Sequence, residues 1–354
     1  MCVFLARLPS FGHIQTVADI NFKRKTLKVT EVELTMINTY SPEGLLFGTP
    51  QNRELLSMGR AGLERAMERG LIMESTALLC DGDMNIHVDL RGAIGIIPKG
   101  EVCLSREGED TKDIAIITRV GKPVCFKVTS IEERGGRTVA YLSRRAAQIE
   151  CKRNYVNDLI PGDIIPARVT HLENFGAFVD IGCGIVSLLS VDCISVSRFS
   201  HPKDRLYSGM LINTVVKLID YERDRIFVSM RELLGTWREN ADAFSAGQTV
   251  AGIIRSVESY GVFVELAPNL AGLAELRDDI PFLREGDVCG RMAAVYIKSI
   301  IPERMKIKLV LVDSYRGELG APALRYFIDC DKVRHIDSWR YSPPECGKVI
   351  ETVF

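Results

Sequence analysis

A ten-residue stretch that occurs twice limits the folds open to this chain more than any other feature. ENFGAFVDIG starts at Glu173, and ESYGVFVELA starts at Glu258. Both copies read aromatic, glycine, small residue, phenylalanine, valine, acid, aliphatic. Apolar and polar residues alternate after the glycine, which is typical of a β-strand with one face in a core. Because the stretch recurs, we expect a repeated β unit.

The residues around both copies repeat as well. Residues 161–233 and 246–313 each contain short strand-like runs separated by turns. Residues 77–150 have the same layout with weaker patterning, and Gly135-Gly136 predicts a hairpin turn there. The sequence therefore predicts a mainly β chain of three tandem, five-stranded small barrels, the first of which is degenerate.

The segments before the barrels follow other patterns. Residues 1–35 form an N-terminal extension that matches nothing else in the chain, and a mis-assigned start codon upstream of Met36 would account for it. Residues 36–76 contain apolar positions at helical spacing, which predict one amphipathic helix over 52–71 with Gly70 near its end.

Two further segments connect and close the array. Residues 231–245 predict a short linker helix, and Trp237 within it is expected to pack against a neighbouring barrel. The C-terminal tail, residues 314–354, has no clear strand or helix period. We expect the tail to wrap back on the third unit.

Charge and cysteine content narrow the classes of function. Lys and Arg number 45 against 46 Asp and Glu, so any site for a polyanion must be local. Ten cysteines are spread without a CxxC pair, and the spacing of Cys330, His335 and Cys346 fits no standard zinc site. No apolar run reaches membrane-span length. We therefore expect a reduced, cytoplasmic protein without metal, cofactor or membrane contact.

The repeated stretch poses a problem of side-chain parity. Phe175 and Phe178 lie three positions apart, so strict strand alternation would put them on opposite faces. A bulge at Gly176 would return both rings to one face, with Asp180 pointing outward to solvent. Paired exposed rings would stack unpaired bases, whereas the alternative is that both rings belong to the core. Recurrence of the pair as Tyr260 and Phe263 favours stacking.

Charged residues accompany the rings in the second unit. Asp220 and Arg225 flank a tight turn, where Arg225 could meet a phosphate or the two could simply stabilise the turn. The connection from Ser197 to Arg205 is locally basic: it carries Arg198, His201, Lys203 and Arg205 against one acid, Asp204. The alternative for this connection is an ordinary solvated loop.

These residues together resemble a known family, the RNA-binding repeat of ribosomal protein S1, which is an OB-fold barrel. The resemblance rests on FGAFVDIG, the loop with His201-Pro202, LIDYERDRIFVS, and AGQTVAGIIRSVESYGVFVELA. It implies tandem OB-fold barrels. It also implies RNA contacts from Phe175, Phe178, Asp220 and Arg225 in the second unit and from Tyr260, Phe263 and Lys306 in the third.

Departures from the family pattern limit that transfer. Ser190 stands near the position where the family has a histidine, and no carboxylate stands at the third unit's aspartate position. Ile86 and Val88 occupy the first unit where aromatics would be expected, so we expect that unit to pack rather than bind.

The resemblance implies a non-enzymatic protein that binds single-stranded RNA, mRNA above all, in translation and in association with the small ribosomal subunit. Two alternatives stay open at this point. The repeats could deliver RNA to a processing or degrading activity, although no acidic cluster, HExxH or P-loop is present to supply one. The barrels could instead dock on protein. No small-molecule substrate is expected.

Overall fold

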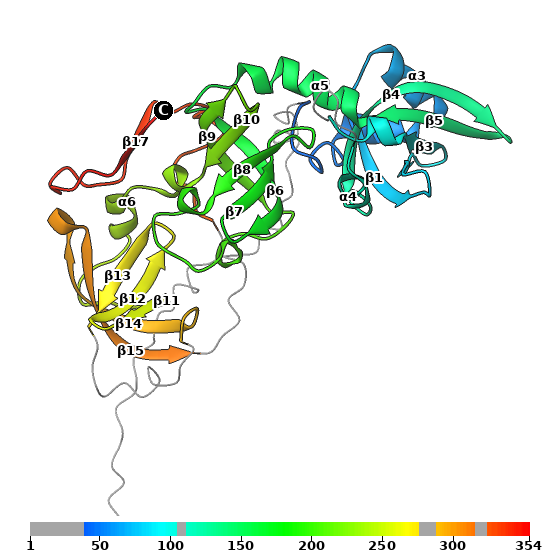
Figure 1. Ribbon diagram of the computed structural model, residues 1–354. Helices are drawn as coiled ribbons and strands as arrows, with labels where there is room; N and C mark the ends of the chain where they lie inside the picture. Colours follow the sequence, from blue (N-terminus) through cyan, green and yellow to red (C-terminus); the bar gives the residue numbers. More distant parts are fainter. Residues whose placement is uncertain (1–38, 105–110, 276–287, 316–323) are drawn as a thin grey trace, which may run out of the picture.

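The computed structural model describes residues 39–104, 111–275, 288–315 and 324–354. Three closed barrels of five strands follow one another along the chain (Figure 1). The first contains β1 (Met73–Cys80), β2 (Ile86–Asp89), β3 (Ile94–Ile97), β4 (Pro123–Arg134) and β5 (Arg137–Ser143). The second contains β6 (Ile164–Glu173), β7 (Gly176–Asp180), β8 (Val186–Ser190), β9 (Leu211–Asp220) and β10 (Arg225–Ser229). The third contains β11 (Thr249–Glu258), β12 (Gly261–Ala267), β13 (Leu270–Ala274), β14 (Met292–Ile301) and β15 (Lys306–Tyr315).

Strand pairing is the same in all three barrels. The first strand pairs with the second and the fourth in antiparallel fashion, and the third pairs with the fifth in parallel. This is the five-stranded OB-fold arrangement, so the predicted fold class is confirmed. The hairpin at Gly135-Gly136 is confirmed too, since both glycines have the positive φ that a tight hairpin turn requires (57° and 74°).

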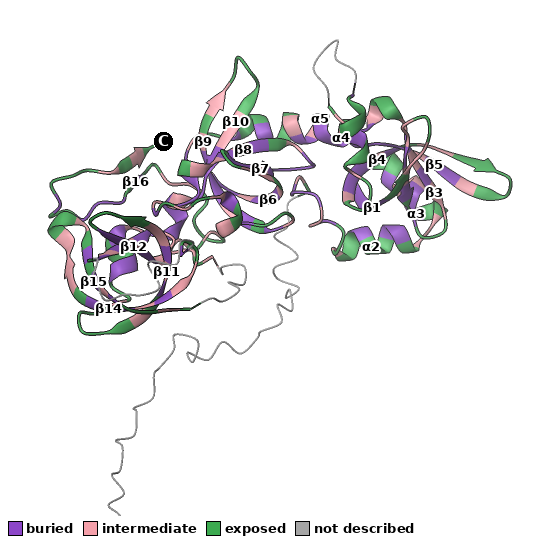
Figure 2. Ribbon diagram, turned by 60° about the horizontal axis from the view of Figure 1, so that its bottom comes forward, coloured by how far each residue is buried: buried purple, intermediate pink, exposed green. Residues whose placement is uncertain are grey.

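Each barrel encloses its own apolar core. Buried residues alternate with half-buried and exposed ones along strands such as β14 and β15 (Figure 2). In the second barrel Val179, Ile181 and Leu189 are completely buried, as the alternation of the repeated stretch predicts.

The predicted helix over 52–71 is in fact two helices. α2 (Pro50–Ser57) and α3 (Arg60–Glu68) are separated at Gly59, which has a φ of 56° that ends helical geometry. A Cβ at Gly62 would lie 1.9 Å from the Leu55 carbonyl oxygen, so the two helices approach closely there. The apolar spacing was read correctly as amphipathic, but it does not show a break within the helical segment. Both helices pack on the first barrel's core.

Short helices lie within the first barrel and between the barrels. α4 (Asp113–Ile117) precedes β4, and α5 (Arg144–Asn154), which the sequence analysis missed, joins the first barrel to the second. Ser143 caps α5 by accepting a hydrogen bond from the Ala146 amide, a signal that was present in the sequence. α6 (Trp237–Ala241) lies inside the predicted linker, and Trp237 is buried in the third barrel's core as predicted.

The C-terminal segment crosses two barrels rather than one. Ile336 and Phe354 pack against Ile164 and Val215 of the second barrel. Trp339 joins the core of the third. The segment also forms a small sheet, β16 (Ser338–Arg340) with β17 (Glu351–Val353), which runs beside both barrels (Figure 1). The prediction of contact with the third unit holds but was incomplete, because short strands without periodicity leave little signal.

Two general observations complete the description. Among the described helices, none is long and apolar enough to cross a membrane. The cysteines from Cys80 to Cys346 are free thiols.

Candidate nucleic-acid interface

The first ring pair lies where β6 turns into β7. β7 begins at Gly176, so Phe175 occupies a two-residue hairpin turn and not a strand. The turn, rather than a bulge at Gly176, removes the parity problem. The Phe175 and Phe178 ring centroids are 6.0 Å apart with an interplanar angle of 87°, and Phe175 is 54% exposed. Neither ring belongs to the barrel core.

The third barrel repeats this arrangement closely. Tyr260 lies in the two-residue turn between β11 and β12 and is 62% exposed. Its ring centroid lies 6.1 Å from that of Phe263, at 90°. The core of this barrel also excludes both rings. The geometry, and not only the letters, is therefore duplicated.

The glycine between the rings is required by a close backbone approach. A Cβ at Gly176, whose φ is 156°, would lie 2.3 Å from the Leu189 carbonyl oxygen. A Cβ at Gly261 would lie 2.7 Å from the Ala274 carbonyl oxygen. In both barrels the second strand thus starts against the third strand's backbone, and this contact fixes where the turn aromatic lies.

Strand register extends the surface beyond the two rings. Phe178 pairs with Leu188, Leu188 with Phe227, and Phe227 with Leu218. Residues paired across neighbouring strands share a face, so these four side chains form one outer row across β7, β8, β10 and β9. All four lie outside the core, and Leu218 is 55% exposed. We call them the outer row; His171, paired with Phe178 on β6, extends it.

The outer row beyond Phe178 was not predicted from the sequence. Its signal was the alternation of Leu188 with the buried Ser187 and Leu189. The matching row of the third barrel contains Phe263, Leu273, Lys308 and Ser299. Lys308 therefore stands where the second barrel has Phe227.

The first barrel presents different chemistry at the same place. Ile86 and Val88 are buried in its core. His87 lies between them on β2 and pairs with Ile96 of β3, which in turn pairs with Tyr141 of β5. The His87 imidazole Nε2 lies 3.0 Å from an Asp81 carboxylate oxygen, and hydrogen bonds from His87 and Asn85 lower the pKa of Asp81 to about 2. This barrel has no ring pair at the position of Phe175 and Phe178.

The predicted charged residues lie on or near this face. Arg225 is exposed and pairs in register with Asp220. Because Arg225 stands two residues before Phe227 on β10, the two side chains point to the same face of the sheet. Asp220 accepts a hydrogen bond from the Arg223 amide at 3.0 Å, so it does stabilise the turn. Lys306 stands two residues before Lys308 on β15, in the place that matches Arg225. Each of these contacts with RNA remains a prediction.

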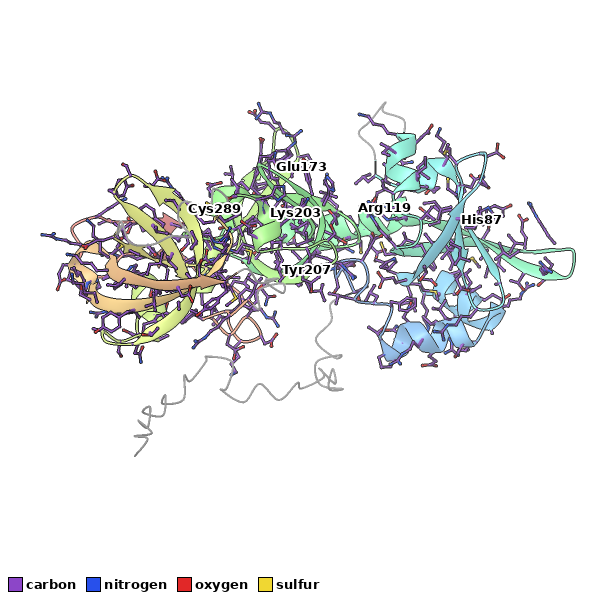
Figure 3. All side chains as sticks on the ribbon, turned by 90° about the horizontal axis from the view of Figure 1, so that it is seen from below. His87, Arg119, Glu173, Lys203, Tyr207 and Cys289 are labelled. Atoms are coloured by element: carbon purple, nitrogen blue, oxygen red, sulfur yellow. The ribbon has the colours of Figure 1, made fainter. Side chains whose placement is uncertain are left out.

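The basic connection is less positive than its sequence suggested. Arg198 and Lys203 are exposed, and His201 accepts a hydrogen bond from the Lys203 amide at 3.0 Å. Arg205 is buried and paired with Glu265 of the third barrel, with its guanidinium 5.1 Å from the Phe199 ring centre. Figure 3 shows Lys203 and Tyr207 on the middle barrel.

Comparison with known proteins agrees with this geometry. Residues 158–231 match the S1 RNA binding domain family. This match covers the whole of the second barrel, which we call the S1 domain.

Relatives named small ribosomal subunit protein bS1 extend the similarity. The protein from Rhodopseudomonas palustris is 30% identical over 196 residues, which is 54% of this chain and 33% of that protein. The one from Staphylococcus saprophyticus is 31% identical over 163 residues, or 45% of this chain and 41% of that protein. The aligned regions thus span only about a third to two fifths of these relatives.

One solved structure aligns over a longer stretch. A multidomain protein with nucleic acid binding domains from Streptococcus pneumoniae covers 71% of this chain and 76% of its own, at 15% identity. Its TM-score is 0.23, too low to support a conclusion about function.

Asp180, the acid of the repeated stretch, was predicted to face solvent, and this prediction is wrong. In the S1 domain, Asp180 is buried and accepts hydrogen bonds from the amides of Glu43, Gly182 and Gly184 at 2.7–2.9 Å. In the third barrel the matching Glu265 is buried against Arg205, and Arg255 donates to it at 2.6 Å. In both copies the acid contacts the preceding unit. These residues therefore fix one barrel to the next.

The junction of the first barrel with the S1 domain holds further buried charge. Glu43 receives two hydrogen bonds from the Arg144 guanidinium, at 2.6 and 2.9 Å. Burial raises the pKa of Asp180 to about 7, with the Glu43 carboxylate adding to the rise. Burial likewise raises the pKa of Glu74 to about 7, against hydrogen bonds from the Gly44 and Phe47 amides.

Proposed function

We propose that this chain binds single-stranded RNA, mRNA in translation above all, on the outer faces of its second and third barrels, without catalysing a reaction. Bases stack on the two ring pairs, while Arg225, Lys306 and the exposed cations of the 198–203 loop contact phosphates. The similarity to proteins named small ribosomal subunit protein bS1 supports a place beside the small ribosomal subunit.

The observation that carries this proposal is the duplicated ring geometry. Two pairs, one on each barrel, have nearly the same centroid separation and interplanar angle and leave their turn aromatic more than half exposed. Neither ring of a pair lies in a barrel core, and together the rings offer π-faces to unpaired bases of any sequence. Duplex RNA keeps its bases stacked inside, so single strands are the favoured ligand.

The test is a binding titration with a fluorescent oligouridylate of about 20 nucleotides, longer than the roughly 4–16 that one OB barrel covers. One stacked base is worth about 1–3 kcal/mol, so Phe175→Ala with Phe178→Ala should weaken binding about fivefold to 150-fold. The dependence of log Kd on log salt should not change, because no phosphate contact is removed.

A matched control comes from the third barrel. Tyr315 is 52% exposed on β15, seven residues and thus roughly 23 Å beyond Lys308. Tyr315→Ala should bind as the unmodified protein does. Equal affinity of the ring variant and this control would refute the proposal, and cleavage of the oligonucleotide with added divalent metal would favour the degradation alternative.

A further inference from the structure

A pocket of about 380 Å³ lies where the first barrel meets the second. Arg119 and Lys122, between α4 and β4, line its first-barrel side. Arg168 and His171 of β6 line its second-barrel side. Figure 3 shows Arg119 at the boundary between these two barrels. The pocket thus draws its side chains from two domains.

The acidic groups that line this pocket are already engaged. Both carboxylate oxygens of Glu43 bond to the guanidinium of Arg144, which is not among the residues that line the pocket. Asp180 accepts three backbone hydrogen bonds, and burial raises its pKa to about 7, which reduces its charge near neutral pH. Little negative charge remains to balance the cations.

The basic residues of the pocket, by contrast, are only partly paired with acids; His171 lies 2.8 Å from a Glu173 carboxylate oxygen. In the parts of the chain that the structure describes, neither Lys122 nor Arg168 has a carboxylate within ion-pair distance. Arg168 donates instead to the Glu43 carbonyl oxygen at 2.7 Å. Arg119 lies 3.8 Å from a Glu43 oxygen that Arg144 already occupies. Burial and then the neighbouring Arg119 lower the pKa of Lys122, as expected where like charges face each other.

The pocket is continuous with the outer face of the S1 domain. His171 belongs to both, because it lines the pocket and pairs in register with Phe178. Its side chain is 63% exposed. Arg168 lies three residues before His171 on β6, which is about 10 Å along the strand. The pocket therefore adjoins the outer row at His171.

We propose that this junction pocket binds a backbone phosphate of the RNA strand that lies across the second barrel, with Lys122 and Arg168 as its main ligands. The inference rests on the proposed function and extends it. The first barrel, which lacks the ring pair, contributes charge rather than stacking. Guanidinium and ammonium groups from two sides suit a tetrahedral anion.

The direct test is lysine acetylation of the full chain, read by mass spectrometry. A bound oligouridylate of about 20 nucleotides should slow acetylation of Lys122 severalfold and leave Lys348, an exposed lysine of the C-terminal segment, unchanged. Equal labelling of Lys122 with and without RNA would overturn the proposal. Inorganic phosphate alone is the second arm: full protection by phosphate that RNA does not reproduce would assign the pocket to a free anion and also overturn it.

A substitution separates this inference from the proposed function. Lys122→Ala should weaken binding about fivefold, as for an exposed ion pair of about 1 kcal/mol. It should also reduce the slope of log Kd against log salt by about 0.7. Lys348→Ala should change neither. If the ring substitutions weaken binding while Lys122→Ala leaves both the affinity and the slope unchanged, the pocket proposal is refuted and the proposed RNA binding is not. If the ring substitutions have no effect, the proposed function itself is refuted.

Discussion

The junction between the second and third barrels should depend on one carboxylate more than on either of its arginine partners. Glu265 on β12 is 4% exposed and bonds two guanidinium groups, those of Arg205 and Arg255. Arg205 is 1% exposed, and the side chain of Arg255 is 7% exposed. The acid therefore neutralises two buried charges at once.

The two single substitutions at this site differ in what they leave behind. Glu265→Gln leaves both guanidinium groups buried without their shared acid, and an uncompensated buried charge costs about 3–5 kcal/mol. Arg205→Met leaves Glu265 paired with Arg255, so the loss is confined to hydrogen bonds, about 1–3 kcal/mol. In the Glu265→Gln protein Arg255 still has Asp204 at 3.2 Å, so the uncompensated buried charge is that of Arg205. We expect the acid substitution to be the more damaging.

Urea unfolding followed by tryptophan fluorescence measures this difference. Both tryptophans of the chain, Trp237 and Trp339, lie in the third barrel's core, so their signal reports that barrel. Glu265→Gln should lower the urea midpoint by at least about 1 M. Glu258→Gln, an exposed acid on β11, is the control and should shift stability by less than about 0.5 kcal/mol. A loss for Arg205→Met equal to or larger than that for Glu265→Gln would refute the reasoning.

Three further predictions follow from particular contacts. The pKa values of Glu74 and Asp180 are raised to about 7, so the folded protein holds these protons more tightly than the unfolded chain; the resulting stabilisation is full below about pH 4 and is lost as pH rises to about 7. Thermal unfolding should therefore show a higher Tm at mildly acidic than at mildly alkaline pH. Glu74→Gln should reduce this difference in Tm, and an unchanged difference would contradict the prediction. Gly176→Ala should lower the free energy of unfolding by about 3 kcal/mol, because the added Cβ would clash with the Leu189 carbonyl oxygen. Gly100→Ala is the control and should change it little, because there is open space around Gly100. Similar circular-dichroism melting curves for the two variants would count against the close approach at Gly176. Phe227→Ala should weaken RNA binding without altering the slope of log Kd against log salt. Lys308→Ala, at the matching position of the third barrel, should lower that slope by about 0.7. The same slope in both variants would argue against the register that matches Lys308 to Phe227.

Several features of the interface could be predicted from sequence because they depend on local pattern. The ring pairs Phe175–Phe178 and Tyr260–Phe263 stand at fixed spacing around a glycine, and the copy in a second unit argued against a core role. The outer residues Leu188 and Phe227 were equally readable in principle from strand alternation. They were missed because the strand pairing that aligns them with Phe178 cannot be read from one strand at a time.

The sequence by itself determined the strand alternation and the paired aromatics, because each depends on residues within a few positions of one another, and the repeat of this pattern indicated three similar units. Only the tertiary structure decided which charged residues are exposed and which are buried in contacts between barrels. Asp180 meets the Glu43 amide 137 positions away, and Glu265 meets Arg205 across 60. Alternation says which side of a strand a residue faces, but what covers that side depends on distant segments that fold against it. An acid predicted to meet water therefore joins two barrels instead, and a basic loop loses Arg205 to a buried ion pair.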